Sequence, residues 1–180
     1  MILIVVCVAS IGCAAKPDRV IAADAPDSAL QPIAASFTRT VDRIQSADDA
    51  KWHDGWTGNM FVNAFGGQNM GLCHEWRDVV FRGVVFDVRA QGWNCFGIAI
   101  NRGTGHEHHA VLVARPELTS EQLLPAPPET GAYVLDAWSR GKADIYRLKD
   151  WITLPAFKKV PAELIDMDAE LRNRDRAKLR

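Results

Sequence analysis

The chain has almost no net charge and no apolar run long enough to cross a bilayer, and these absences narrow its function. Its formal net charge is -1, so the protein as a whole has no electrostatic attraction to nucleic acid or anionic lipid. Residues 1–12 are almost continuously apolar, but a transmembrane helix needs roughly 20 such residues. No internal repeat is present. A length of 180 residues with 48% hydrophobic content suits one packed globular domain.

Cysteine is also scarce, and four cysteines do not make a disulfide framework in a chain of this length. Cys7 lies within the apolar N-terminal segment and Cys13 follows it directly. Only Cys73 and Cys95 remain for the rest of the chain. In an oxidising compartment these two could pair, which would give Cys73 a structural role in place of a chemical one.

The N-terminus resembles an export signal, and Ser10-Ile11-Gly12-Cys13 resembles a bacterial lipobox, in which Cys13 is lipidated after cleavage. No Lys or Arg precedes the apolar run, and Ser10 stands where lipoboxes usually carry Leu or Val. An ordinary signal cleaved near Ala14-Ala15 is therefore the alternative. We expect a signal at 1–12, a tether at 13–26 and one domain at 27–180. The expected location is the cell envelope, as a periplasm-facing lipoprotein, or otherwise the periplasm or exterior.

A polar, glycine-containing turn leads into Cys73, and apolar residues behind it recur at helical spacing. These residues are Leu72, Trp76, Val79, Val80 and Val84. Cys73 is thus predicted in the first turn of a buried helix, where unpaired N–H groups and the helix dipole favour a thiolate. The alternative is that Cys73 is an ordinary packing residue, since cysteine is among the most often buried residue types.

The order of the remaining elements predicts an α+β fold. A helix that Asp27 or Ser28 caps at its N-terminus is expected to precede the Cys73 helix. Segments 94–101, 109–114 and 132–138 then have the apolar, β-branched character of strands in an antiparallel sheet. A last, charged helix is expected from Ala162. The aromatic and amide-rich segment 51–67 is expected to form either one wall of a cleft or a hydrophobic cluster under a loop.

Three residues with complementary chemistry follow one another in these elements: Cys73 at a helix start, His109 at the head of a strand, and Asp136 in the next strand. A thiol is mostly protonated at neutral pH, so a nucleophilic cysteine needs an imidazole to take its proton. A carboxylate then fixes the tautomer of that imidazole and stabilises its charged form. Side chains facing one another across paired strands are close enough for the imidazole–carboxylate hydrogen bond.

Other assignments of these roles remain open. His108 and His109 point to opposite faces of a strand, so only one of them can meet Cys73; the apolar run that begins at Ala110 favours His109. His74 adjoins Cys73 but points elsewhere around the helix. Asn101 is the alternative orienting residue. His106, His108 and His109 with Glu107 are a weaker candidate for a metal site, because they lack helical i, i+4 spacing and a distal Cys/His pair.

These residues and their order resemble the papain-like cysteine peptidase clan, and within it the bacterial transglutaminase-like cysteine peptidases. The resemblance covers roughly Asn59 to Trp138 and rests on His109-Ala-Val-Leu-Val and Val134-Leu-Asp-Ala-Trp138. It implies a nucleophile-bearing helix packed on an antiparallel sheet, with Cys73, His109 and Asp136 as the triad. It also implies an oxyanion donor several residues before the cysteine, for which Gln68 and Asn69 are candidates, beside the N–H of Cys73. The residues after Cys73 depart from papain, which has small residues there.

The expected function is that of an exported thiol hydrolase, which cleaves a peptide or peptidoglycan-stem amide bond through a thioester acyl-enzyme. The expected partners are such a substrate and the membrane, through the lipid on Cys13; no cofactor, metal or nucleic acid is expected. One alternative is transglutaminase-type acyl transfer, which shares the first step. Another is a non-catalytic envelope scaffold or binding lipoprotein on the same fold.

Overall fold

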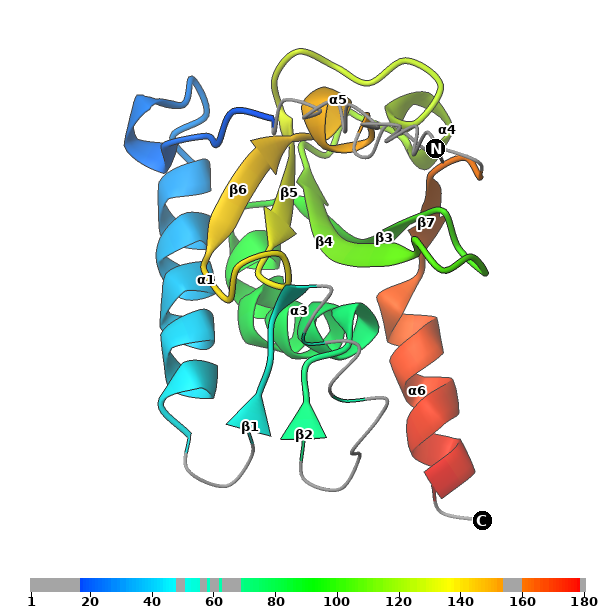
Figure 1. The fold of residues 1–180 in the computed structure, drawn as a ribbon. Helices are drawn as coiled ribbons and strands as arrows, with labels where there is room; N and C mark the ends of the chain where they lie inside the picture. The colour runs from blue at the N-terminus through cyan, green and yellow to red at the C-terminus, as the bar shows by residue number, and fades with distance from the viewer. Residues whose placement is uncertain are drawn as a thin grey trace, which may run out of the picture.

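Helices pack on an antiparallel sheet, which confirms the α+β class (Figure 1). The computed structural model describes residues 17–47, 51–55, 58, 62, 69–153 and 160–178. In chain order the elements are η1 (Ala22–Asp24), α1 (Leu30–Gln45), β1 (Lys51–Trp52), β2 (Asn69–Met70), α3 (Cys73–Ala90), β3 (Asn94–Ile100), β4 (His108–Ala114), α4 (Ser120–Leu123), β5 (Ala132–Asp136), β6 (Asp144–Arg147), α5 (Leu148–Trp151), β7 (Glu163–Ile165) and α6 (Met167–Lys178).

The larger sheet has the strand order β6-β5-β4-β3-β7, and every neighbouring pair in it is antiparallel. β3 and β4 form a hairpin in which Ile100 lies opposite His108, so residues 101–107 make the turn between them. β5 pairs with the other side of β4, with Val111 opposite Leu135. The central strand β4 therefore begins beside the end of β5. β1 and β2 form a separate parallel pair.

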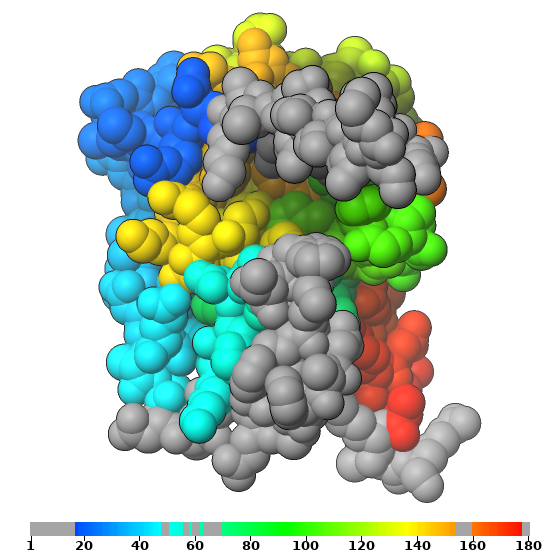
Figure 2. All heavy atoms as spheres, viewed as in Figure 1, coloured from blue at the N-terminus to red at the C-terminus, as the bar shows by residue number. Residues whose placement is uncertain are grey.

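One face of the sheet is covered by α3, and α1 packs against α3 in turn (Figure 1). Val111 and Val113 of β4 share this core with Trp76 and other apolar residues of α3. The two helices approach closely at Gly83, where an added Cβ would lie only 2.3 Å from Oγ1 of Thr40. In the space-filling view α1 (left) and α6 (red, lower right) lie at opposite edges of the face shown (Figure 2).

The opposite face of the sheet carries a second core. Ala110, Leu112 and Ala114 of β4 contribute to it, and Leu123, Leu148 and Trp151 from α4 and α5 cover it. All seven residues of β4 are buried. Because both faces of the strand are covered by apolar layers, its side chains show no alternation between polar and apolar residues.

Some boundaries differ from those expected from the sequence. Segment 82–91, which suited a helix or a strand, continues α3 as far as Ala90. The last helix begins at Met167 rather than Ala162, because Glu163–Ile165 joins the sheet beside β3 as β7. The first helix begins at Leu30, and Asp27 does not cap it. The carboxylate of Asp27 instead accepts hydrogen bonds from the Tyr133 hydroxyl and from the N–H of Gly131.

The expected signal and the lipidation site Cys13 lie outside the described residues, as does most of the aromatic segment 51–67. Within that segment, the ring of Trp52 lies 4.9 Å from that of Trp76 on α3, as in a hydrophobic cluster. None of the helices described here is long and apolar enough to cross a membrane.

Candidate active site

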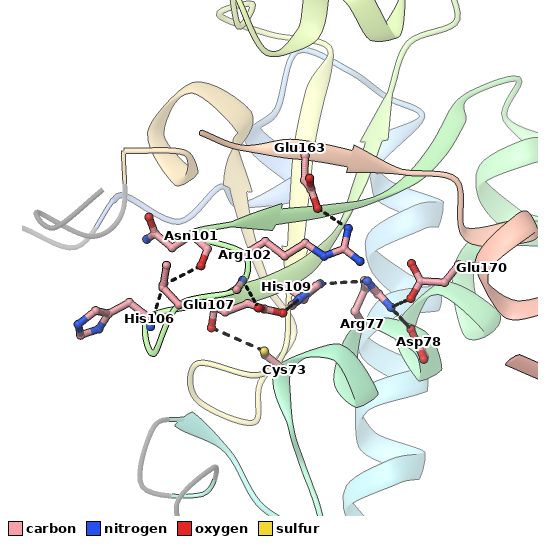
Figure 3. Close-up of polar contacts among 12 residues, drawn as sticks. Cys73, Arg77, Asp78, Asn101, Arg102, His106, Glu107, His109, Glu163 and Glu170 are labelled. Atoms are coloured by element: carbon pink, nitrogen blue, oxygen red, sulfur yellow. Dashed lines mark hydrogen bonds and ion pairs between the residues drawn. The ribbon is translucent and has the colours of Figure 1, made fainter. Parts of the chain in front are cut away.

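Cys73 is the first residue of α3, as the sequence predicts, and it is buried. The carboxylate of Glu75 turns back and accepts hydrogen bonds from the N–H groups of Gly71 (2.8 Å) and Leu72 (2.9 Å), which fixes the entry to the helix. As the first helical residue, Cys73 has an N–H with no carbonyl acceptor inside the helix. Its thiol donates to the backbone carbonyl of Glu107 at 3.8 Å (Figure 3).

The approach to Cys73 requires a glycine at position 71. Gly71 has a φ of 131°, which side-chain-bearing residues rarely adopt. A Cβ at this position would lie 2.1 Å from the carbonyl oxygen of His53. That same oxygen accepts a hydrogen bond from Nε1 of Trp76, and the N–H of His53 donates to Met70. The segment before α3 is thereby held against residues 52–54.

Asp136 is buried at the end of β5 and is bound by an imidazole, but the imidazole is that of His108. Nε2 of His108 lies 2.7 Å from Oδ2 of Asp136. The same oxygen accepts hydrogen bonds from Nε1 of Trp151 (3.1 Å) and Oγ of Ser139 (3.0 Å), and Oδ1 accepts one from the N–H of Ser139. Because a carboxylate only accepts, Nε2 of His108 must carry a proton.

The other nitrogen of His108 is available to Cys73. Nδ1 is buried and forms no hydrogen bond of ordinary geometry with any described residue. The Cys73 side chain nevertheless lies close enough to the ring to contribute to the raised pKa of His108. The contact is therefore looser than a fully formed hydrogen bond, as is common between catalytic groups that tighten only around a substrate.

The surroundings of His108 favour its charged form. Burial alone would lower the pKa of His108, but the charge and hydrogen bond of Asp136, followed by Cys73, raise it to about 9. Burial would likewise raise the pKa of Asp136, but His108, Trp151 and Ser139 together lower it. The rings of Trp138 and Trp151 lie 4.6 Å and 5.2 Å from the imidazole and shield it from water. The pair is thus an imidazolium and a carboxylate at neutral pH.

The expectation that His109 would face Asp136 is wrong by one residue. Val111 lies opposite Leu135, so Asp136 comes level with Ala110 and shares its face of the sheet with Ala110 and His108. His109 points to the other face, toward α3. There its Nδ1 lies 3.0 Å from Nη1 of Arg77 and its Nε2 contacts the carboxylate of Glu107 (Figure 3).

Several other candidates can now be placed. Gln68 lies outside the described residues; the backbone of Asn69 pairs with Lys51 in β2, and its side chain is not described. Asn101 follows β3 with a φ of 53°, and its Oδ1 accepts a hydrogen bond from the N–H of Val160. The His74 ring lies 6.3 Å from the ring of His109. Within the described part of the chain, no group of three or more His, Cys, Asp or Glu side chains is arranged to hold a metal ion.

Cys73 and Cys95 are both free thiols, so the disulfide that would have given Cys73 a structural role is not formed. Cys95 lies near the start of β3, at the opposite end of that strand from Ile100, which faces His108. Although part of its side chain reaches solvent, desolvation raises the pKa of the Cys95 thiol to about 12. Cys95 is therefore an unreactive thiol within the same molecule.

The site combines a thiol at a helix N-terminus, an imidazole bound to a buried carboxylate and a first-turn N–H with no acceptor inside its helix. Such groups can together carry out nucleophilic attack on a carbonyl carbon. In comparisons with family models, curated proteins and solved structures, nothing matches this chain. The case for a function therefore depends on the geometry of these side chains.

Proposed function

We propose that the protein is a thiol hydrolase that cleaves an amide bond through a thioester acyl-enzyme, with Cys73 as nucleophile, His108 as general acid and base, and Asp136 as the orienting carboxylate. The observation that carries this proposal is the arrangement of His108: Nε2 is bound to Asp136, which leaves the buried Nδ1 to Cys73. The helix-on-sheet arrangement is compatible with a papain-like or transglutaminase-like fold, which belongs to the proposal.

The reaction follows from where protons and electron pairs can move. The sulfur of Cys73, with its proton on Nδ1 of His108, attacks the carbonyl carbon and forms a C–S bond. The negative charge that develops on the carbonyl oxygen is stabilised by the N–H of Cys73 at the positive end of α3. His108 then donates its proton to the leaving nitrogen as the C–N bond breaks. Water, deprotonated by His108, hydrolyses the thioester and restores the thiol.

Asp136 acts on this cycle through the imidazole. The hydrogen bond from Nε2 holds the ring in the tautomer that turns Nδ1 toward Cys73, and the carboxylate stabilises the imidazolium formed in each half-reaction. Ser139 and Trp151 hold the carboxylate itself. A carboxylate with this orienting role must itself be held in place, which accounts for the hydrogen bonds that Asp136 accepts from His108, Ser139 and Trp151.

The first test needs no substrate. Alkylation by iodoacetamide at pH 6, followed by peptide mapping of each cysteine, compares Cys73 with the unreactive Cys95 in one sample. We expect Cys73 to react much faster than Cys95 in the wild type and to lose that advantage in His108→Gln, in which an amide can still donate to Asp136 but no base is present. Equal rates at the two cysteines of the wild-type protein would rule out an activated Cys73.

The second test identifies the reaction. The protein is incubated with a peptide library and with peptidoglycan stem peptides, and new amine ends are identified by mass spectrometry. Replacing Cys73 by Ala or His108 by Gln is expected to lower kcat/KM by about 10³-fold or more. Transglutaminase-type transfer shares the thioester and is distinguished by adding a primary amine, which would then appear in the product. Products that persist unchanged in Cys73→Ala would contradict the proposal.

The proposed location is the cell envelope, with the lipid on Cys13 as anchor, because residues 1–12 resemble an export signal. An enzyme tethered there would meet envelope proteins and peptidoglycan stems, which is why the proposed substrate is a peptide. Membrane fractionation of the wild type and of Cys13→Ser tests this: the wild type is expected in the membrane fraction, and the variant in the soluble envelope fraction. Equal distribution of the two proteins would contradict lipidation.

A further inference from the structure

A second polar network, centred on α3 and His109, lies beside Cys73 (Figure 3). Because neighbouring side chains of a strand point to opposite faces, His109 and this network lie on the face of β4 opposite His108. The α3 residue at the centre of the network is Arg77, which is fully buried and whose Nη2 binds Asp78 (2.8 Å) and Glu170 of α6 (2.7 Å). Arg77 follows Cys73 by four residues, so the two side chains lie on the same face of α3. A fully buried arginine is costly unless it is completely paired, so an arginine in this position needs a reason.

The proton positions in this network are fixed by Arg77. A guanidinium only donates, so Nδ1 of His109 must accept from it, and Nε2 of His109 must carry the proton and donate to Glu107. Burial lowers the pKa of His109; the hydrogen bond to Glu107 opposes this shift and the charge of Arg77 adds to it. His109 is therefore a neutral imidazole with one tautomer at neutral pH, and both of its nitrogens are occupied.

Glu107 connects this network to the candidate active site. One oxygen of its carboxylate accepts from His109 and the other from the N–H of Gly103 (2.6 Å), which closes the turn 101–107. Its backbone carbonyl accepts from the thiol of Cys73, and the next residue is His108. The side chain of Glu107 thus fixes the backbone at residues 107 and 108. This backbone carries the carbonyl that binds the Cys73 thiol and the imidazole of His108.

We propose that His109 is a positioning residue: its hydrogen bond to Glu107, made in the tautomer that Arg77 fixes, holds the start of β4 at the distance from α3 at which His108 meets Cys73. This inference rests on the proposed function, since it takes Cys73 and His108 as the reacting pair. It gives the adjacent histidines separate roles, one in proton transfer and one in placing its neighbour.

Two substitutions separate the link to Glu107 from the link to Arg77. In His109→Gln, the amide nitrogen can take the place of Nε2 and still donate to Glu107. In His109→Asn, the shorter amide can take the place of Nδ1 and accept from Arg77, but it does not reach Glu107. Tyr133→Phe is the matched control, because it removes one buried hydrogen bond, to Asp27, away from Cys73.

The measurement is the rate of Cys73 alkylation by iodoacetamide at pH 6, relative to Cys95, together with the melting temperature of each variant. We expect His109→Asn to slow alkylation about tenfold, which corresponds to about 1.4 kcal/mol in the barrier. His109→Gln and Tyr133→Phe are expected to stay within about twofold of the wild type on the same scale. With a substrate in hand, His109→Asn should lower kcat more than it changes KM.

The other outcomes overturn the inference. Equal slowing by Gln and Asn would show that the contact with Glu107 is not what matters, and no slowing by Asn would show that the position is only structural. Slowing by Tyr133→Phe to the same degree would assign the effect to global stability. If His109→Asn does not fold, Glu107→Ala removes the same hydrogen bond between residues 107 and 109. The alkylation rate of Cys73 in that variant is then judged by the same criteria. Failure of the proposed function appears differently, as a wild-type Cys73 no faster than Cys95.

Discussion

Removing the imidazole of His108 tests the contact between His108 and Asp136, and the test needs no substrate. In His108→Ala, the buried carboxylate of Asp136 keeps Trp151 and Ser139 as donors but loses its only cationic partner among the described residues. Breaking a buried ion pair by deleting one partner typically costs about 3–5 kcal/mol. Since three hydrogen bonds to the carboxylate survive, we expect a cost near the lower end of that range.

The pKa of His108 gives a second estimate of how much the ion pair contributes to the free energy of unfolding. A pKa of about 9 in the folded protein, against about 6.5 for an unperturbed histidine, corresponds to roughly 3 kcal/mol of stability. Because the folded-state pKa is the higher one, this contribution is fully present below pH 6.5 and is lost as the pH rises through about 9. Both estimates predict that His108→Ala lowers the free energy of unfolding at neutral pH by about 3 kcal/mol, or the melting temperature by about 6–12 °C.

The assay is urea unfolding of the wild type, His108→Ala, Asp136→Asn and the double variant between pH 6 and pH 10. We expect the double variant to be about 2 kcal/mol more stable than the sum of the single changes implies, because it no longer buries an unpaired charge. The wild-type stability should fall from pH 6.5 to 9, and that fall should be absent in His108→Ala. A loss below 1 kcal/mol, or strict additivity, would falsify the buried ion pair.

Three further predictions follow from the same contacts. The kcat/KM of amide hydrolysis should fall as the pH rises through about 9, where His108 loses the proton it donates to the leaving amine; a pH–kcat/KM profile that keeps rising to pH 10 would contradict this. Gly71→Ala should unfold at least 1–3 kcal/mol more easily in urea, since its Cβ would overlap the His53 carbonyl and its φ of 131° is strained. Trp151→Phe, which removes one donor to Asp136, should cost about 1 kcal/mol in urea unfolding, and a neutral result would remove Trp151 from the support of that carboxylate.

Much of the architecture was predictable because helical and strand periodicities are local properties of the sequence. The apolar spacing behind Cys73 predicted the helix that begins at that residue, and the strands around 94–101, 109–114 and 132–138 are present with small shifts of their ends. β7 was missed because three residues of ordinary composition become a strand only by pairing with β3. Asp27 had the chemistry of a helix cap, but tertiary contacts with Tyr133 and Gly131 use its carboxylate.

The choice between His108 and His109 was not decided by any local pattern. In a sheet with one solvated face, alternation would show which residues point inward, but β4 is apolar on both faces. The missing information was the register of β5 on β4. A shift of one residue in this register would place Asp136 on the same face of the sheet as His109 and not His108. That register is set across residues 115–131, a connection too long for turn chemistry to determine. The sequence could show only that one histidine would meet Cys73, not which.

The two histidines also show why adjacent residues of one type can have opposite chemistry. At His108 the charge and hydrogen bond of Asp136 outweigh burial, so the charged form is favoured. At His109 burial is the largest effect and the charge of Arg77 adds to it, so the neutral form is favoured despite the hydrogen bond to Glu107. The protonation state of each buried histidine therefore depends on the charged groups that contact its ring. Because the two side chains point to opposite faces of β4, each histidine meets a different set of these groups.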